Sequence, residues 1–165
     1  MLRTSRFVTG IGVVLFSSGL LALPEDAAQP IHIQADSLEM DQQAQRGIYR
    51  GSVRVDQGTL RVTADEMIVE IRDNKVIKIT ASGNPAHYQQ QLEKNEGQVE
   101  ADASIIIYHT LEERLDLRGN ALLTQQGNKI SGDYIRYDIV AGKVDAQAEE
   151  DGRVLVVLEP ADLEE

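Results

Sequence analysis

The chain has 165 residues, a formal net charge of −11 and neither cysteine nor tryptophan. This length suits about one domain with a single core. The acidic balance argues against nucleic acid as a partner, because binding to phosphates depends on Lys and Arg. It also provides no basic patch for anionic lipid surfaces. Without cysteine, the fold must be held by burial and strand pairing rather than by disulfides.

The first 22 residues are predicted to be a cleaved signal peptide. A basic start precedes the apolar run from Phe7 to Leu23, and the small residue Ala22 lies near its end. This order is typical of a secretory leader. The alternative is an uncleaved membrane anchor, but the run is near the lower length limit for spanning a bilayer. The sequence thus divides into a signal peptide at 1–22, a short N-terminal segment at 23–29, a folded domain at 30–160 and an acidic tail at 161–165.

From Pro30 onward, apolar and polar residues alternate with a period of two, which predicts β-strands. The apolar pairs are Ile31 and Ile33, Leu38 and Met40, Val53 and Val55, Leu60 and Val62, Ile77 and Ile79, Leu115 and Leu117, and Val144 and Ala146. With the turn signals between them, they predict an all-β sandwich, roll or solenoid of about 12–16 short strands and no substantial helix after the leader. The apolar run Val154 to Leu158 predicts a last strand, either buried on both faces or paired with something outside the chain.

A degenerate phrase recurs four times, with Asp36, Asp65, Asp102 and Asp133 each following a small residue and preceding an apolar run. Successive copies are 29, 37 and 31 positions apart. Repeats of this size indicate stacked supersecondary units that bury a common core. Each Asp is expected to shape a turn or bulge by accepting hydrogen bonds from nearby backbone N–H groups. A calcium-binding carboxylate ladder is the less favoured alternative.

Glycines interleave with these aspartates, at Gly51, Gly83 and Gly119. Each lies within a strand pattern, where glycine marks a bulge or bend. We expect them to turn strands from one sheet to another.

Few residues suggest catalysis. The three histidines, His32, His87 and His109, show no metal-ligand spacing, and the sequence has no phosphate-binding loop or nucleophile motif. We therefore predict no enzyme activity, no metal and no cofactor.

The apolar positions two and four residues after each recurrent Asp share one face of the predicted sheet. That face could be an ordinary core filled by its own side chains, or an incompletely closed groove that takes in a lipid chain. Periodicity cannot separate these alternatives, because a core and a lipid groove have the same pattern in one chain.

Several segments resemble the OstA-like family and, within it, the periplasmic bridge proteins of lipopolysaccharide transport. The segments that carry the resemblance are Pro30 to Asp36, Arg50 to Gly58, Gly83 to Ala86, Leu117 to Ala121 and Gly132 to Tyr137. The resemblance covers about residues 28–160. It implies an open, V-shaped β-jellyroll in the periplasm, whose trough shields lipopolysaccharide acyl chains and whose copies stack end to end.

The resemblance and the strand parity together predict which residues would line the trough: Ile31, Ile33, Leu38, Met40, Val53, Val55, Met67, Val69, Tyr88, Ile106, Tyr108, Ile135 and Tyr137. The end-to-end interface would be formed by Ile31, Ile33, Val154, Val156 and Leu158. The implied partners are lipopolysaccharide, through its lipid A acyl chains, an inner-membrane-anchored OstA-like protein, an outer-membrane translocon and further copies of this chain. Two other functions stay open: an adaptor module that binds no lipid, and the membrane-anchored member of the same pathway.

Overall fold

The structure, a computed structural model, describes residues 25–92 and 97–160. The predicted signal peptide and acidic tail lie outside the described residues. Within the described ranges, the helical content is one short 3₁₀ turn, η1 (Glu25–Ala28), and no helix there is long and apolar enough to cross a membrane. The predicted all-β fold class is confirmed, since the rest of the ordered structure is antiparallel sheet.

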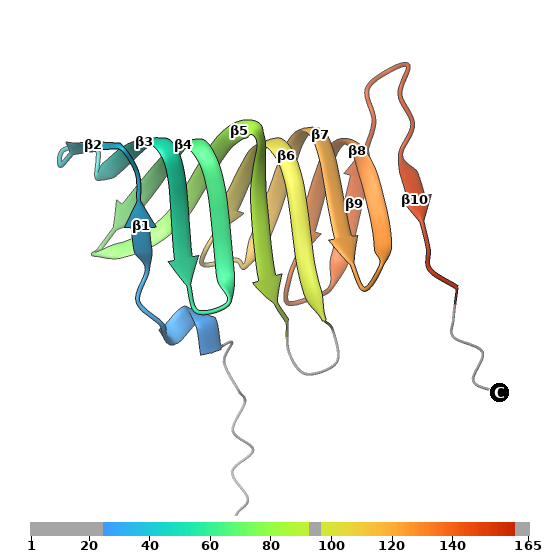
Figure 1. The fold of residues 1–165 in the computed structure, drawn as a ribbon, viewed down its shortest axis with the longest axis horizontal. Coiled ribbons are helices and arrows are strands. Elements are labelled where there is room, and N and C mark those ends of the chain that lie inside the picture. Colours follow the sequence, from blue (N-terminus) through green and yellow to red (C-terminus); the bar gives the residue numbers. More distant parts are fainter. Residues whose placement is uncertain (1–24, 93–96, 161–165) are drawn as a thin grey trace, which may run out of the picture.

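Ten strands form one continuous sheet in the described part of the chain (Figure 1). They are β1 (His32–Gln34), β2 (Ser37–Asp41), β3 (Arg46–Gln57), β4 (Leu60–Arg72), β5 (Lys75–Gln91), β6 (Gln98–His109), β7 (Arg114–Gln125), β8 (Asn128–Asp138), β9 (Lys143–Gln147) and β10 (Leu155–Val157). The strands β3 to β8 pair in sequence order, and every pairing is antiparallel. Within the described residues, no pairing joins the strands at one end of the sheet, β1 and β2, to those at the other end, β9 and β10.

Each of the strands β3 to β8 bends near its middle, so the sheet folds over into two walls (Figure 1). The first wall contains β2, β9 and the half-strands 46–50, 66–72, 75–82, 105–109, 114–118 and 134–138. The second wall contains β1, β10 and the half-strands 53–57, 60–64, 86–91, 98–103, 121–125 and 128–132. The predicted number of short strands was therefore too high, because the sequence pattern counts the two halves of each bent strand separately.

The recurrent glycines lie on this bend, as predicted. Gly51 and Gly119 have φ angles of 82° and 77°, and the register of the neighbouring strands shifts at both positions. Gly83 lies within the register shift between β5 and β6. A side chain at Gly119 would meet the Ser104 Oγ atom at 2.9 Å, so the bend needs glycine for space as well as for backbone conformation.

Three of the four recurrent aspartates also lie on the bend. Asp36 stands between β1 and β2, while Asp65 and Asp133 fall at register shifts. Asp133 accepts a hydrogen bond from the Glu149 backbone N–H at 2.7 Å, but this donor lies 16 positions further along the chain, so the contact ties the bend of β8 to the segment after β9 rather than shaping a local turn. Asp102 differs, because it lies on the second wall and its carboxylate pairs with His87 at 2.8 Å. Ser104 occupies the bend in that repeat.

The core lies between the two walls and is built from the inward-facing residues of both. Of the predicted apolar pairs, Val53, Val55, Leu60, Val62, Ile79, Leu115 and Leu117 are buried. The period-two pattern thus identified most of the inner face on both walls. The predicted pair of Ile77 and Ile79 is the exception, because Ile77 lies at a register shift between β4 and β5 and Val76 packs against the core instead.

Each end of the sheet has an edge made of two short strands. At one end, β1 and β2 pair with opposite halves of β3. At the other end, β10 and β9 pair with opposite halves of β8. The predicted last strand is confirmed as β10, but the alternative that it is buried on both faces is wrong, because Val154 to Leu158 are 38–71% exposed.

Candidate functional site

Two rows of inward-facing residues cross the first wall without interruption. The first row is Leu38, Tyr49, Met67, Ala81, Ile106, Leu117, Ile135 and Ala146, and the second is Met40, Gly47, Val69, Ile79, Tyr108, Leu115, Tyr137 and Val144. Both rows begin on the edge strand β2 and end on the edge strand β9. The apolar lining of the first wall therefore runs from one end of the molecule to the other.

The second wall carries a matching row. Its members are Ile33, Val55, Val62, Tyr88, Ala101, Leu123, Ile130 and Val156. The walls meet at Tyr88 and Tyr108, whose ring centroids are 6.0 Å apart. In the middle of the molecule, the interior is thus filled by the side chains of the two walls.

The ends of these rows are uncovered. Leu38 and Met40 are 53% and 49% exposed on β2, and Val156 is 49% exposed on β10. The next strand inward in each row covers one flank of these residues, but no strand in the described part of the chain continues the sheet beyond them. The apolar interior therefore opens to its surroundings at both ends.

The residues predicted to line the trough fall into three groups. Nine belong to the buried core: Val53, Val55, Met67, Val69, Tyr88, Ile106, Tyr108, Ile135 and Tyr137. Ile31 and Ile33 are partly buried against it. Leu38 and Met40 lie on the same inner rows at the uncovered end. Whether any of them contacts lipid stays a prediction, as does the interface role of Ile31, Ile33, Val154, Val156 and Leu158.

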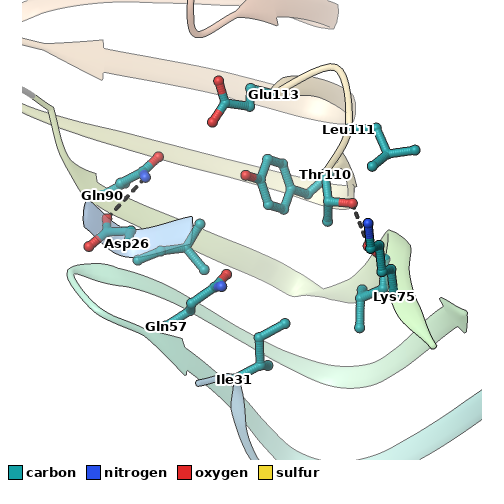
Figure 2. Close-up of a pocket in the computed structure, with 11 residues that line it drawn as sticks. Asp26, Ile31, Gln57, Lys75, Gln90, Thr110, Leu111 and Glu113 are labelled. Atoms are coloured by element: carbon teal, nitrogen blue, oxygen red, sulfur yellow. Dashed lines mark hydrogen bonds between the residues drawn. The ribbon is translucent and has the colours of Figure 1, made fainter. Parts of the chain in front are cut away.

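A cavity of about 280 Å³ lies on the long side opposite the bend, where the turns of the two walls face each other (Figure 2). The β6–β7 turn and the start of β5 border it from the first wall, and the β3–β4 turn borders it from the second. Its apolar lining includes Ile31, Leu60 and Leu111, and its polar lining includes Asp26, Gln90 and Glu113. This volume is close to the lower limit for a small-molecule pocket.

A hydrogen-bonded chain of polar groups leads from this cavity into the core. The Tyr88 hydroxyl donates to Gln90 Oε1 at 2.5 Å. Gln90 Nε2 in turn donates to Asp26 Oδ2 at 3.1 Å (Figure 2). Asp26 also accepts from the Thr59 backbone N–H at 2.7 Å. The turn η1, which carries Asp26, thereby forms part of the cavity wall.

Two of the core tyrosines, Tyr88 and Tyr108, are neutral over the physiological pH range. Burial raises the pKa of Tyr108 to about 12, and the nearby carboxylates of Glu113 and Asp26 act in the same direction. Burial likewise raises the pKa of Tyr88 well above its usual value. Both hydroxyls are therefore uncharged hydrogen-bonding groups at the border between the apolar core and the cavity.

Sequence reasoning missed Asp26, Thr59 and Gln90 as members of a site. Asp26 lies in the segment that the sequence analysis left outside the folded domain, and Gln90 belongs to a run of three glutamines. One feature of the sequence did indicate Gln90: it lies at every second position with Ala86 and Tyr88, which places it on the inner face of β5. The partner of Gln90 lies 64 positions away in the sequence, so no local pattern could identify it.

A second polar cluster lies on the outer face of the first wall. Asp116, with a side chain 5% exposed, accepts hydrogen bonds from Tyr134 at 2.8 Å and Arg136 at 3.0 Å, and it pairs with His109 at 3.0 Å. Arg114 lies 3.7 Å from the same carboxylate. The cluster ties β6, β7 and β8 together on the face opposite the apolar lining.

His87 and His109 each pair with one carboxylate, of Asp102 and Asp116 respectively. Within residues 25–92 and 97–160, no cluster of three His, Cys, Asp or Glu residues could hold a metal ion.

Comparisons with known proteins agree with this architecture. The family model described as "LptA/(LptD N-terminal domain) LPS transport protein" matches residues 32–143. The chain is 35% identical over 137 residues to the lipopolysaccharide export system protein LptH of Pseudomonas aeruginosa, which covers 82% of this chain and 78% of that protein. It is 31% identical over 156 residues to the lipopolysaccharide export system protein LptA of Haemophilus influenzae, which covers 93% and 90% of the two chains.

A solved structure shows the same fold. The crystal structure of P. aeruginosa LptH, the "LptA homologous periplasmic component of the conserved lipopolysaccharide transport device", superposes with a TM-score of 0.75 at 31% identity. The match covers 83% of this chain and all of that one. The resemblance noted in the sequence is confirmed: the chain belongs to the OstA-like family of LptA/(LptD N-terminal domain) LPS transport proteins.

Proposed function

We propose that this protein is a periplasmic segment of a lipopolysaccharide bridge, which shields acyl chains between its two walls on their way from the inner to the outer membrane. The observation that carries this proposal is the set of inner rows that run unbroken from edge to edge, with exposed apolar residues on β2 at one end of the molecule and on β10 at the other. Family membership supports the choice of lipopolysaccharide as the cargo.

Acyl chains need such a path because their transfer through water is unfavourable. Burial of one CH₂ group contributes about 0.8 kcal/mol, so an unshielded acyl chain would face a large barrier. The walls are joined covalently at the bend, and they meet elsewhere through side chains such as Tyr88 and Tyr108. When a lipid enters between the walls, each wall loses apolar contacts with the opposite wall and gains apolar contacts with the acyl chains. This replacement limits the free-energy cost of opening.

The two edges suit end-to-end stacking of copies. Antiparallel alternation across each wall leaves its first and last strands running in opposite directions, so a following copy can add its β1 and β2 without breaking the alternation. In the register that extends the rows, Met40 of one copy would meet Val144 of the next, and Ile33 would meet Val156. Lys143 would face Asp41, an opposite-charge pair, whereas Asp145 would face Glu39, whose carboxylate already pairs with Arg50 at 3.1 Å.

The lipid-carrier function is tested by photo-crosslinking in Gram-negative cells. A photoreactive amino acid replaces Tyr108, which faces inward, or its neighbour Ile107, which faces outward. We expect a covalent lipopolysaccharide adduct at position 108 and not at position 107. Folded, exported protein without an adduct at position 108 would favour an adaptor role in which the core stays sealed.

Stacking is tested separately by introducing pairs of cysteines, one at each end of the molecule, into this cysteine-free chain. Oxidation of a Met40→Cys/Val144→Cys variant should give a ladder of covalent oligomers. The matched variant Glu39→Cys/Val144→Cys places one thiol on the outer face and should give far fewer. Equal yields from the two variants would contradict the proposed register.

A further inference from the structure

Residues 25–30, called the strap here, cross the cavity mouth and are fastened there by one carboxylate. Asp26 Oδ1 accepts the Thr59 backbone N–H at 2.7 Å, and Asp26 Oδ2 accepts the Thr59 hydroxyl at 2.5 Å and Gln90 Nε2 at 3.1 Å. Gln57 adds a hydrogen bond at 3.1 Å to the Gln29 carbonyl oxygen. The carboxylate fits closely against Gly58, where a Cβ atom would collide with it.

The donors that hold Asp26 belong to the second wall, so they remain in place if the strap leaves. Gln90 is 7% exposed, and its Oε1 atom is already engaged by the Tyr88 hydroxyl. The Gln90 amide N–H therefore needs an acceptor from outside the wall, because a buried donor without a partner is unfavourable. Thr59 is exposed at the edge of the cavity, where its backbone N–H and hydroxyl are two further donors. In the described structure, the chain's own carboxylate supplies that acceptor.

Apolar groups adjoin these donors on the cavity side. Leu60 is buried between Thr59 and the second-wall row, and Val76 and Leu111 approach from the first wall. The cavity thus combines donors at one side with an apolar surface that continues into the core. A ligand that fits both parts has an oxygen acceptor attached to an apolar chain.

We propose that Thr59 and Gln90 form a binding site for an oxygen acceptor of an acylated amphiphile, and that Asp26 competes with the ligand for this site. Loading then requires the strap to leave, with a phosphate or acyl carbonyl oxygen replacing the Asp26 carboxylate. The inference rests on the proposed lipid-carrier function and adds to it a polar subsite and an autoinhibitory contact.

Release of the strap also affects the end of the molecule. The strap runs directly into Ile31 and β1, which is the edge strand of the second wall. Ile31 itself lines the cavity. Occupation of the cavity is therefore coupled to the edge on which a neighbouring copy would add, since both involve the same short stretch of chain.

Binding of fluorescently labelled lipopolysaccharide to the purified protein tests the competition. An Asp26→Ala variant should bind about 3–10-fold more tightly than the wild type, because the closed strap reduces the binding-competent fraction. An Asp138→Ala variant is the matched control: it removes the same charge and, away from the cavity, one side-chain acceptor to which the Ala141 backbone N–H donates. Equal gains in both variants would overturn the proposal, since loss of negative charge alone would explain them.

The role of Gln90 is tested without the strap contact. An Asp26→Ala/Gln90→Leu variant should bind at least 3-fold more weakly than Asp26→Ala, and equal affinity would overturn the assignment of Gln90.

Inorganic phosphate is the second probe. If phosphate alone displaces the strap, the site holds a free anion and the acylated-ligand assignment is wrong. If neither the wild type nor any variant binds lipopolysaccharide, the proposed function itself fails.

A reversible lock gives an independent readout. A Gln29→Cys/Gln57→Cys variant can join the strap to the second wall, where the two native residues share a hydrogen bond. Its oxidised form should bind lipopolysaccharide at least 10-fold more weakly than the same sample after reduction, while single-cysteine variants should not respond to reductant. Unchanged binding in the oxidised form would show that the ligand enters without displacing the strap.

Discussion

Replacement of Asp116 by alanine should destabilise the fold more than any other single change on its outer surface. In the sequence of β7, Asp116 lies between two inward-facing residues, Leu115 and Leu117. Its carboxylate is on the outer face, where groups from β6 and β8 contact it. Its removal would leave Tyr134, Arg136 and His109 without their shared acceptor. The same contacts link β6, β7 and β8 in the register that places Tyr108, Leu117 and Ile135 in the core.

The expected magnitude follows from burial. Loss of one partner from a buried ion pair costs about 3–5 kcal/mol. The partners here reach water, since the Arg136 side chain is 49% exposed, so the lower limit applies and we expect a loss of about 3 kcal/mol. For a chain of this length, each kcal/mol corresponds to about 2–4 °C, which gives a decrease in Tm of about 6–12 °C.

Urea unfolding followed by far-ultraviolet circular dichroism measures this loss. The matched control is Asp145→Ala on the same outer face, because Asp145 is 54% exposed and pairs at 3.5 Å with Lys143. The control should change the free energy of unfolding by less than about 0.5 kcal/mol. A loss below about 1 kcal/mol for Asp116→Ala would refute the view that this cluster fixes the strand registers.

The same cluster predicts a pH dependence. Burial alone would raise the pKa of Asp116, but hydrogen bonds from Arg136, Tyr134 and His109 and the charge of Arg114 outweigh it and hold this pKa below its usual range. A carboxyl whose pKa is lower in the folded state stabilises the protein above the pKa of the unfolded chain, about 3.9. The stability difference between wild type and Asp116→Asn should therefore be constant from pH 7 to 5 and shrink as the pH falls below about 4.

Two further substitutions test the interior and the bend. Met67→Ala should cost about 2–4 kcal/mol in urea unfolding, because Met67 is fully buried in an inner row, whereas Glu39→Ala on exposed β2 should cost less than about 0.5 kcal/mol. Gly119→Ala should cost about 1–3 kcal/mol and clearly more than Gly142→Ala, since both positions have positive φ but only the first would press a side chain against Ser104.

The alternation of apolar and polar residues predicted well which side chains face inward, but it predicted poorly how far those side chains are buried. Leu38 and Val53 have the same kind of pattern, and both prove to face inward. Val53 is 1% exposed and Leu38 is 53% exposed, because burial also depends on which strand lies next in the sheet. The neighbours of an edge strand are set by tertiary structure, or by another molecule, and a period of two contains no information about them.

Polar contacts across long sequence separations were beyond local reasoning as well. Asp26 and Gln90 are ordinary surface residues by composition, and their contact depends on how η1 packs over the β3–β4 turn. The recurrent aspartates lie near a bend that the repeat itself indicated, but the contact of Asp133 with the Glu149 backbone N–H, 16 positions away, could not be identified from the repeat. The bend could be predicted because its residues recur in the sequence repeat. The residues around the cavity opposite the bend do not recur, so no repeat indicated them.

The bend also explains why the pattern had to be interpreted in short pieces. In β4, the inward residues that flank the bend are Ala64 and Met67, and in β6 they are Ala103 and Ile106, so three positions separate each pair instead of an even number. One bulged residue, Asp65 or Ser104, absorbs the difference. A strict period of two carried across the whole of β4 would place one wall with its polar face inward. The bulges therefore keep both inner faces apolar, and a core packed between the two walls depends on them as much as on the apolar residues themselves.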